Sequence, residues 1–381
     1  MSTSSRASSS IPFIDLQAQR RRMGGRVEAA IGRVLDHGAF IMGPEVAELE
    51  RQLAAYAGTR HAIGCASGTD ALLLPLLAAG VRTGDAVFVP AFTFAATAEV
   101  ASMVGATPVF VDVRPDDFNI DSRSLAEAVE GIASGPLRPR AVIPVDLFGQ
   151  PADYEAVAEV ARRHGLLVVQ DAAQSFGGER HGRRAGAHGD AAGTSFYPSK
   201  PLACYGDGGA VLTDDDDMAA LIRSLRVHGQ GPGGAYDHVR IGIAGRLDTI
   251  QAAVLIEKLA VFPEELAARE RVAGRYDEAL RGLVGTPRRV EGARSAWAQY
   301  TVQLDDRDRV ARELRERGVP TAIHYPRPLN LQPAYRHYPV APGGVPVAEA
   351  LALRVLSLPM HPYLEPETQD RIVAALRDAL G

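Results

Sequence analysis

The chain has 381 residues, a formal net charge of −5 at pH 7, 46% hydrophobic residues and 23% charged residues. This length fits two domains with substantial cores, and the negative charge gives no general reason to bind nucleic acid or an anionic membrane. Only two cysteines occur, Cys65 and Cys204, which is too few for a disulfide framework and lacks metal-ligand spacing. A reducing cytoplasm is therefore expected.

The N-terminal residues, MSTSSRASSS, are rich in serine and are not followed by an apolar run long enough for a signal peptide. We expect a disordered tail over residues 1–10. No segment of the sequence reaches the roughly 18 consecutive apolar residues that a membrane span requires. The sequence therefore predicts no membrane partner.

The apolar spacing over residues 11–56 predicts two helices, with Gly43 and Pro44 in the turn between them. Further along, short β-branched runs alternate with helical segments, which indicates βαβ units and a mostly parallel sheet covered by helices on both faces. The expected strands are 61–67, 86–90, 107–113, 141–147 and 166–172. Ligands of such sheets lie beyond the carboxyl ends of the strands, so the residues there are the candidates for function.

A further strand is expected over 208–213, followed by a helix that Asp215 or Asp216 can cap. A long helix over 249–262 is expected to end at Pro263, and a second helix then opens a smaller α+β unit. That unit has strands near 298–304 and 321–324, a helix at RDRVARELRERG and two more helices before the end. The predicted organisation is a tail (1–10), a large domain (11–262) and a small C-terminal domain (263–381).

Lys200 is the first candidate for chemistry. It follows a Thr/Ser/Phe/Tyr run that is typical of a strand, stands before Pro201, and precedes Gly206, Gly208 and Gly209. Most lysines lie on surface helices, but this pattern predicts a lysine on a turn inside the protein. Burial lowers the pKa of a lysine, and the neutral amine can then form a Schiff base with the cofactor pyridoxal 5'-phosphate (PLP).

A PLP site also needs a partner for the pyridine nitrogen. Asp171 ends the apolar run LLVVQ, so its carboxylate is expected at the sheet edge, where it can hold that nitrogen protonated. The alternative is an aspartate that caps the next helix. Gln174 can donate a hydrogen bond to the phenolic oxygen of the cofactor.

Other residues are candidates for binding the cofactor phosphate and for stacking on the cofactor ring. Gly68 and Thr69 follow the first strand and open a helix, where backbone N–H groups and the helix dipole bind anions. Ser195 is a second phosphate donor. Phe94 follows the second strand and can stack on the cofactor ring. The alternatives are an ordinary helix N-cap and a core phenylalanine.

Other sequence patterns give no support to a different function. GQGPGG (229–234) matches G-x-G-x-x-G but follows a helix, which disfavours an NAD-dependent dehydratase or epimerase. The run Asp214 to Asp217 reads as a solvated helix start, and His181 and His188 lie among arginines and glycines. No metal site is therefore expected. The sequence also lacks the G-x-S-x-G elbow of serine hydrolases.

From about Phe13 to Leu364 the sequence resembles the DegT-type nucleotide-sugar aminotransferases, which are fold-type I PLP-dependent enzymes. The motifs that carry the resemblance include SGTDAL, PAFTFAATAE, DAAQSFG, SFYPSKPLACYGDGGA and HYPRPLNLQPAY. The resemblance implies that fold, with a smaller C-terminal α+β domain, and a homodimer with shared active sites. It implies the same roles as above for the residues that match the family's motifs: Lys200, Asp171, Gln174, Phe94, Gly68, Thr69 and Ser195.

The resemblance also implies an activity. The family moves the amino group of L-glutamate onto a keto group of a nucleotide-linked sugar, with pyridoxamine phosphate as the intermediate form of the cofactor. The closest similarity is to enzymes acting at carbon 3 of UDP-2-acetamido-2-deoxy-3-oxo-glucuronate in surface polysaccharide synthesis. A carbon-4 or dTDP-linked keto-sugar and a non-catalytic PLP-binding regulator are the alternatives. Lysine at position 200, where sugar dehydratases of the family have histidine, favours transamination.

Three further residues are implied as substrate contacts. His324 and Tyr325, in the HYPRPLN segment, can contact the sugar or its carboxylate, and Arg246 can serve phosphate or substrate. The chain departs from many relatives at Ala244, where an asparagine would reach the cofactor phosphate of the neighbouring subunit. A methyl group cannot donate that hydrogen bond.

Overall fold

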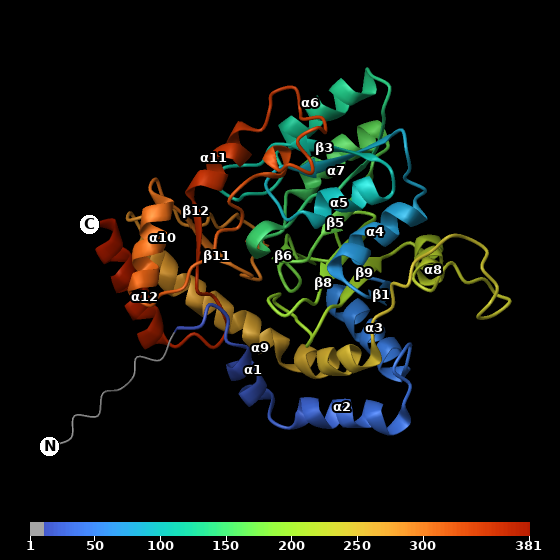
Figure 1. Cartoon of the computed structure of the whole chain (residues 1–381), viewed down its shortest axis with the longest axis horizontal. Helices are drawn as coiled ribbons and strands as arrows, with labels where there is room; N and C mark the ends of the chain where they lie inside the picture. Colours follow the sequence, from blue (N-terminus) through green and yellow to red (C-terminus); the bar gives the residue numbers. More distant parts are fainter. Residues whose placement is uncertain (1–10) are drawn as a thin grey trace.

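The computed structural model describes residues 11–381, and the tail expected over residues 1–10 lies outside this range. A seven-stranded sheet forms the centre of the molecule (Figure 1). Its strands, in spatial order, are β1 (His61–Cys65), β9 (Gly209–Thr213), β8 (Ala191–Ser195), β5 (Leu167–Asp171), β4 (Arg138–Val142), β2 (Asp85–Pro90) and β3 (Thr107–Val111). The neighbouring pairs from β8 to β3 are parallel, whereas β9 is antiparallel to both β1 and β8. The predicted fold class, a mostly parallel sheet covered by helices, is confirmed.

Alternation along the strands assigns each face of the sheet to a different set of helices. In β2, Val87 and Val89 pack in the cluster of α4 (Gly68–Ala78) and α5 (Ala96–Met103). The intervening residues of β2 pack in the cluster of α6 (Ser122–Ala133) and α7 (Tyr154–His164). Because successive side chains of a strand point to opposite faces, both faces of the sheet are buried.

Next to β1 and β9, helices again cover both faces. On one side lies α8 (Asp216–Leu225), and on the other lie α3 (Pro44–Ala57) and α9 (Thr249–Leu280). Asp215 caps α8 as expected, since its carboxylate accepts a hydrogen bond of 2.9 Å from Met218 N.

The N-terminal segment contains three helices rather than the two expected. Besides α2 (Arg26–His37) and α3, it forms α1 (Leu16–Met23), which buries only Gln19 and Met23. So short a helix with so little apolar surface gives no clear periodic signal.

The helix end predicted at Pro263 is wrong. α9 runs for 32 residues through that position, and Figure 1 shows it above α1 and α2. A proline removes one N–H from a helix, but burial on both sides of it compensates. Phe262 packs against α3 in one cluster, and Val272 packs in the C-terminal cluster. The division of the chain at residue 262 remains a prediction, and it falls inside this helix.

The C-terminal region pairs β11 (Tyr300–Gln303) with β12 (Val355–Leu358), and it adds α10 (Arg307–Glu316), α11 (Pro346–Arg354) and α12 (Pro366–Leu380). The strand expected over 321–324 is reduced to one isolated bridge, between Ala322 and Ser357. β12 was not expected, because a short continuous apolar run does not separate strand from helix.

The remaining elements are short. β6 (Glu179–Arg180), β7 (Arg183–Arg184) and β10 (Ala293–Arg294) form a small sheet, and η1 (Leu147–Gly149) and η2 (Leu329–Leu331) are single turns. Within residues 11–381, no helix has the length and apolar character needed to cross a membrane.

Gly209 in β9 tests the packing of the sheet. A Cβ atom there would lie 2.3 Å from Ser67 O, so we expect Gly209→Ala to lower the free energy of unfolding by about 1–3 kcal/mol in urea denaturation. The control is Gly274→Ala in α9, where a Cβ meets no neighbouring atom within 4 Å and stability should rise by up to about 1 kcal/mol. Wild-type stability of the Gly209 variant would contradict this packing.

Candidate functional site

The strand register brings three chain segments together at one edge of the sheet. Cys65, the last residue of β1, and Ser195, the last residue of β8, both lie opposite Gly209 of β9. In the next strand, Asp171 of β5 lies opposite Gly193 of β8. Because β1, β8 and β5 run in the same direction, their carboxyl ends meet where ligands bind in sheets of this kind.

The first feature of this edge is a cradle for an anion. Gly68 opens α4 and lies against Ser195, so that a Cβ at position 68 would lie 2.6 Å from Ser195 Cβ and 2.9 Å from its Oγ. Ser67 caps the helix by accepting a hydrogen bond of 3.0 Å from Asp70 N. Thr69 is the next residue of that first turn, whose free N–H groups favour negative charge. The residues present therefore fit a phosphate group.

Arg246 lies beside the cradle, because it forms a β-bridge with Cys65. Its neighbour on the same segment, Ala244, is exposed and forms a bridge with Val227 instead. The segment thus brings a guanidinium, rather than an amide, to this side of the site.

Asp171 is the buried acid of the site, with 6% of its surface exposed. Burial raises the pKa of its carboxyl group, while a hydrogen bond from Ala173 N, the charge of Lys200 and a hydrogen bond from Thr97 Oγ1 oppose that change. The two bonds are 3.1 Å from Ala173 N to Oδ1 and 3.0 Å from Thr97 Oγ1 to Oδ2. They fix the carboxylate in orientation, as recognition of a protonated ring nitrogen requires.

The sequence contains two lysines, Lys200 and Lys258, and their surroundings differ. Burial lowers the pKa of half-buried Lys200, and the charge of Asp171 opposes that change. Lys258 of α9 is 1% exposed. Its Nζ donates a hydrogen bond of 2.7 Å to Ala203 O and lies 4.5 Å from the ring centroid of Tyr205. Lys258 thus supports the turn that follows Lys200. This leaves Lys200 as the lysine amine beside Asp171.

An amide and an aromatic pair complete the cluster. Gln174 Oε1 accepts a hydrogen bond of 2.6 Å from Phe148 N, and its Nε2 donates to Tyr325 OH at 3.3 Å. The Tyr325 ring lies 6.2 Å from that of Phe94, which is 57% exposed and so leaves a ring face open to a ligand. The C-terminal segment therefore reaches the strand ends.

His324 is held by the same segment. Its Nδ1 lies 2.9 Å from Ser357 Oγ of β12, and burial together with the charge of Lys200 lowers its pKa to about 4. At neutral pH the ring is uncharged, so it offers a hydrogen bond rather than a positive charge.

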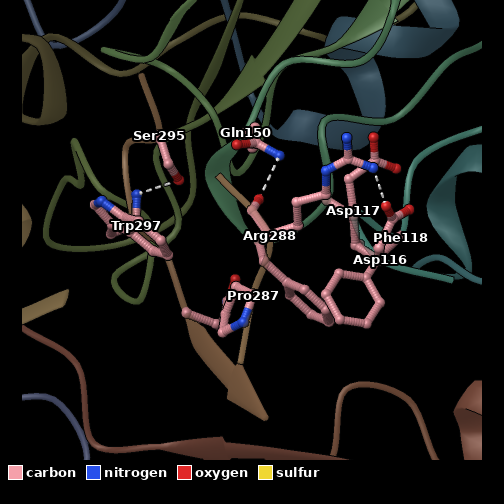
Figure 2. A pocket seen from close by; sticks show the side chains of 11 residues that line it. Asp116, Asp117, Phe118, Gln150, Pro287, Arg288, Ser295 and Trp297 are labelled. Atoms are coloured by element: carbon pink, nitrogen blue, oxygen red, sulfur yellow. Dashed lines mark hydrogen bonds and ion pairs between the residues drawn. The ribbon is translucent and has the colours of Figure 1, made fainter. Parts of the chain in front are cut away.

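A small pocket lies next to Phe148, whose N–H bonds Gln174 (Figure 2). It is lined in part by Phe118, Phe148 and Trp297, and Figure 2 shows the Arg288–Asp116 ion pair among its lining residues. Its volume of about 20 Å³ holds about one water molecule, so it cannot be the place of an aromatic cofactor.

Sequence reasoning missed two residues of the site. Thr97 is fully buried in α5 and bonds Asp171, and Lys258 supports the lysine turn. Thr97 carries one local signal, since it is a hydroxyl residue among the small apolar residues of AATAEVASM. Nothing in the sequence near Lys258 points to residue 203, which is 55 positions away.

Known proteins resemble the chain over nearly its whole length. The DegT/DnrJ/EryC1/StrS aminotransferase family matches residues 22–377. A UDP-2-acetamido-2-deoxy-3-oxo-D-glucuronate aminotransferase from Pseudomonas aeruginosa is 47% identical over 96% of this chain and 99% of its own.

Two solved structures have the same fold. A DegT DnrJ EryC1 StrS aminotransferase from Brucella abortus is 53% identical, with a TM-score of 0.96 and coverage of 97% of this chain and 100% of its own. DesV from S. venezuelae, in complex with a ketimine intermediate, is 41% identical, with a TM-score of 0.92 and coverage of 97% and 98%. The chain therefore belongs to the DegT/DnrJ/EryC1/StrS aminotransferase family and is a PLP-dependent aminotransferase with the fold-type I architecture.

Proposed function

We propose that this enzyme moves the amino group of L-glutamate onto carbon 3 of UDP-2-acetamido-2-deoxy-3-oxo-glucuronate. The observation that carries the reaction is the meeting of Lys200 with the buried carboxylate of Asp171 beside an anion cradle at one sheet edge. The sugar is proposed from the P. aeruginosa relative of that name, which is 47% identical. This reaction would supply an amino sugar for a surface polysaccharide such as the O-antigen of lipopolysaccharide, and we place it in the cytoplasm.

In this proposal each residue of the cluster has one task. Gly68, Thr69 and Ser195 bind the cofactor phosphate through N–H and O–H groups. Asp171 keeps the pyridine nitrogen protonated, Gln174 bonds the phenolic oxygen, and the ring of Phe94 stacks on the cofactor. When bound, PLP supplies an electron sink for the carbon from which a proton is removed.

Lys200 has two tasks. Its Nζ would hold the cofactor covalently in the resting enzyme. When free and neutral, the Nζ would accept the proton from the α-carbon of glutamate and would then donate a proton, acting as general base and general acid. The lowered pKa caused by burial suits this role, because a protonated amine cannot accept a proton.

The substrate contacts follow from charge. Arg246 is the cation beside the cradle, so it is proposed to pair with phosphate or with the carboxylate of the glucuronate. His324 and Tyr325 supply uncharged hydrogen-bonding groups at the sugar.

A homodimer with shared active sites is part of the proposal. Large apolar side chains are exposed in two loops, at residues 40–42 and again at Tyr236 and Ile241. A second copy of the chain would cover such surfaces. Since the methyl side chain of Ala244 cannot donate a hydrogen bond, the contact from the neighbouring subunit to the cofactor phosphate would have to come from another group, for which Arg246 is our candidate.

The identity of the cofactor lysine is testable by chemical trapping. When the PLP-loaded enzyme is reduced with borohydride, digested and analysed by mass spectrometry, we expect the cofactor on the peptide that contains Lys200. Lys200→Ala should lose this label and abolish turnover. Lys258→Met is the matched control and should keep the label on Lys200. Label on Lys258 in the wild type would refute the assignment.

Removal of the hydroxyl that bonds Asp171 should change the pH profile. In Thr97→Val the carboxylate loses a hydrogen bond that favours its ionised form, so its pKa rises. The acid limb of kcat/KM should then move to higher pH by up to about one pH unit. Thr93→Val is the control and should leave the acid limb in place. Thr93 Oγ1 lies 3.4 Å from Thr97 Oγ1, so it contacts Thr97 and not the carboxylate of Asp171. An unchanged acid limb in Thr97→Val would show that this bond does not tune Asp171.

A panel of keto-sugars tests the substrate. With glutamate as donor, the UDP-linked 3-oxo-glucuronate should give the highest kcat/KM among UDP- and dTDP-linked 3-keto- and 4-keto-sugars. A preference for a 4-keto or dTDP-linked sugar would overturn the proposed substrate but not the reaction. A cofactor spectrum that does not change when glutamate is added would overturn glutamate as the amino donor.

A further inference from the structure

A second cavity, separate from the strand-end site, lies between α7 and the β6–β7 hairpin. It has a volume of about 410 Å³. Its walls include Arg162, Arg180, His181, Arg183 and His188. It shares no lining residue with the cluster around Lys200, and nothing in the proposed transamination uses it.

The cavity is rich in positive charge. Arg162, Arg180 and Arg183 all line it, whereas Glu155 is the single carboxylate among the lining residues. Asp153, at the start of α7, pairs with Arg180 at 3.1 Å and neutralises part of that charge. Arginine side chains gathered around a hollow attract an anion, and the planar guanidinium matches the oxygens of phosphate.

Arg180 has unused hydrogen-bonding capacity. Only 8% of its surface is exposed, and its Nε has no hydrogen-bond partner among the residues that the structure describes. This Nε has almost no accessible surface, so a ligand in the cavity would have to bond the other nitrogens of the Arg180 guanidinium.

His188 forms a rigid part of the wall. Its ring stacks on that of Tyr154 with centroids 4.6 Å apart and an interplanar angle of 13°. Burial lowers the pKa of His188 to about 4, with further lowering by the charges of Arg183, Arg180 and His181. The histidine is therefore neutral at pH 7, and it responds to the charge in the cavity.

We propose that this cavity binds the diphosphate group of a small phosphorylated ligand. Arg162 and Arg183 can each bond one phosphate of a diphosphate, while Arg180 is paired with Asp153, and a volume of about 410 Å³ has room for such a ligand. The ligand is either free diphosphate or a nucleoside diphosphate. The cavity lies apart from the site of chemistry, so the bound ligand would act on the enzyme as an effector rather than as a substrate.

Calorimetric titration of the PLP-loaded enzyme with inorganic pyrophosphate tests this site. We expect saturable binding, and we expect the double variant Arg162→Gln/Arg183→Gln to weaken it by at least about tenfold, since it removes two charged hydrogen-bond donors. Both side chains are exposed, so the variant should fold and should keep its turnover in the absence of pyrophosphate. Arg163→Gln is the matched control on the same helix, because Arg163 pairs with Glu159 and does not line the cavity.

A second readout reports where the ligand binds. In NMR spectra of histidine-labelled enzyme, pyrophosphate should shift the His188 resonance and raise the pKa of its ring, because a nearby negative charge favours the protonated form. UDP that competes with pyrophosphate at this site would identify nucleoside diphosphates as the source, and its failure to compete would point to free diphosphate. Equal affinity of the double variant and the wild type, or binding without a change at His188, would overturn the proposal.

Discussion

The candidate site at the carboxyl ends of β1, β8 and β5 depends on the insertion of β9 between β1 and β8. Because β9 runs against both neighbours, the ends of β1 and β8 lie opposite the same residue, Gly209. A side chain at that position would collide with Ser67 O and Thr194 O, so the close approach of these two carbonyl groups to β9 requires glycine. The anion cradle is thus a consequence of backbone packing within the sheet.

Burial then shifts the pKa values of the two ionisable groups at this site. It pushes the pKa of Asp171 up and that of Lys200 down, so each group is driven toward its neutral form, while their opposite charges partly restore the ionised forms. Hydrogen bonds from Thr97 and Ala173 hold the carboxylate in place, and Lys258 holds the turn that carries Lys200. Lys200 and Asp171 are therefore positioned by groups that have no part in the proposed chemistry.

Position also separates the cradle at Gly68 from the cavity along α7, which are the places where we propose that anions bind. The cradle at Gly68 uses backbone N–H groups at a helix start, which suits a phosphate that must be held in one orientation. The cavity along α7 uses long arginine side chains from a helix and a hairpin, which can adapt to a ligand. In our proposals the cradle binds the cofactor phosphate, and the cavity offers a point from which a phosphorylated metabolite can act.

Local sequence determined much of this protein. Its periodicity predicted the alternating strands and helices, and the residue types at the strand ends predicted a lysine, an acid and a cradle at one edge, because period and turn chemistry are properties of short segments. Only the tertiary structure decided the antiparallel direction of β9, the continuity of α9 through Pro263, the strand β12, and the roles of Thr97 and Lys258 as supports. Each of these depends on contacts between residues far apart in the chain, where burial outweighs the preference of the local segment.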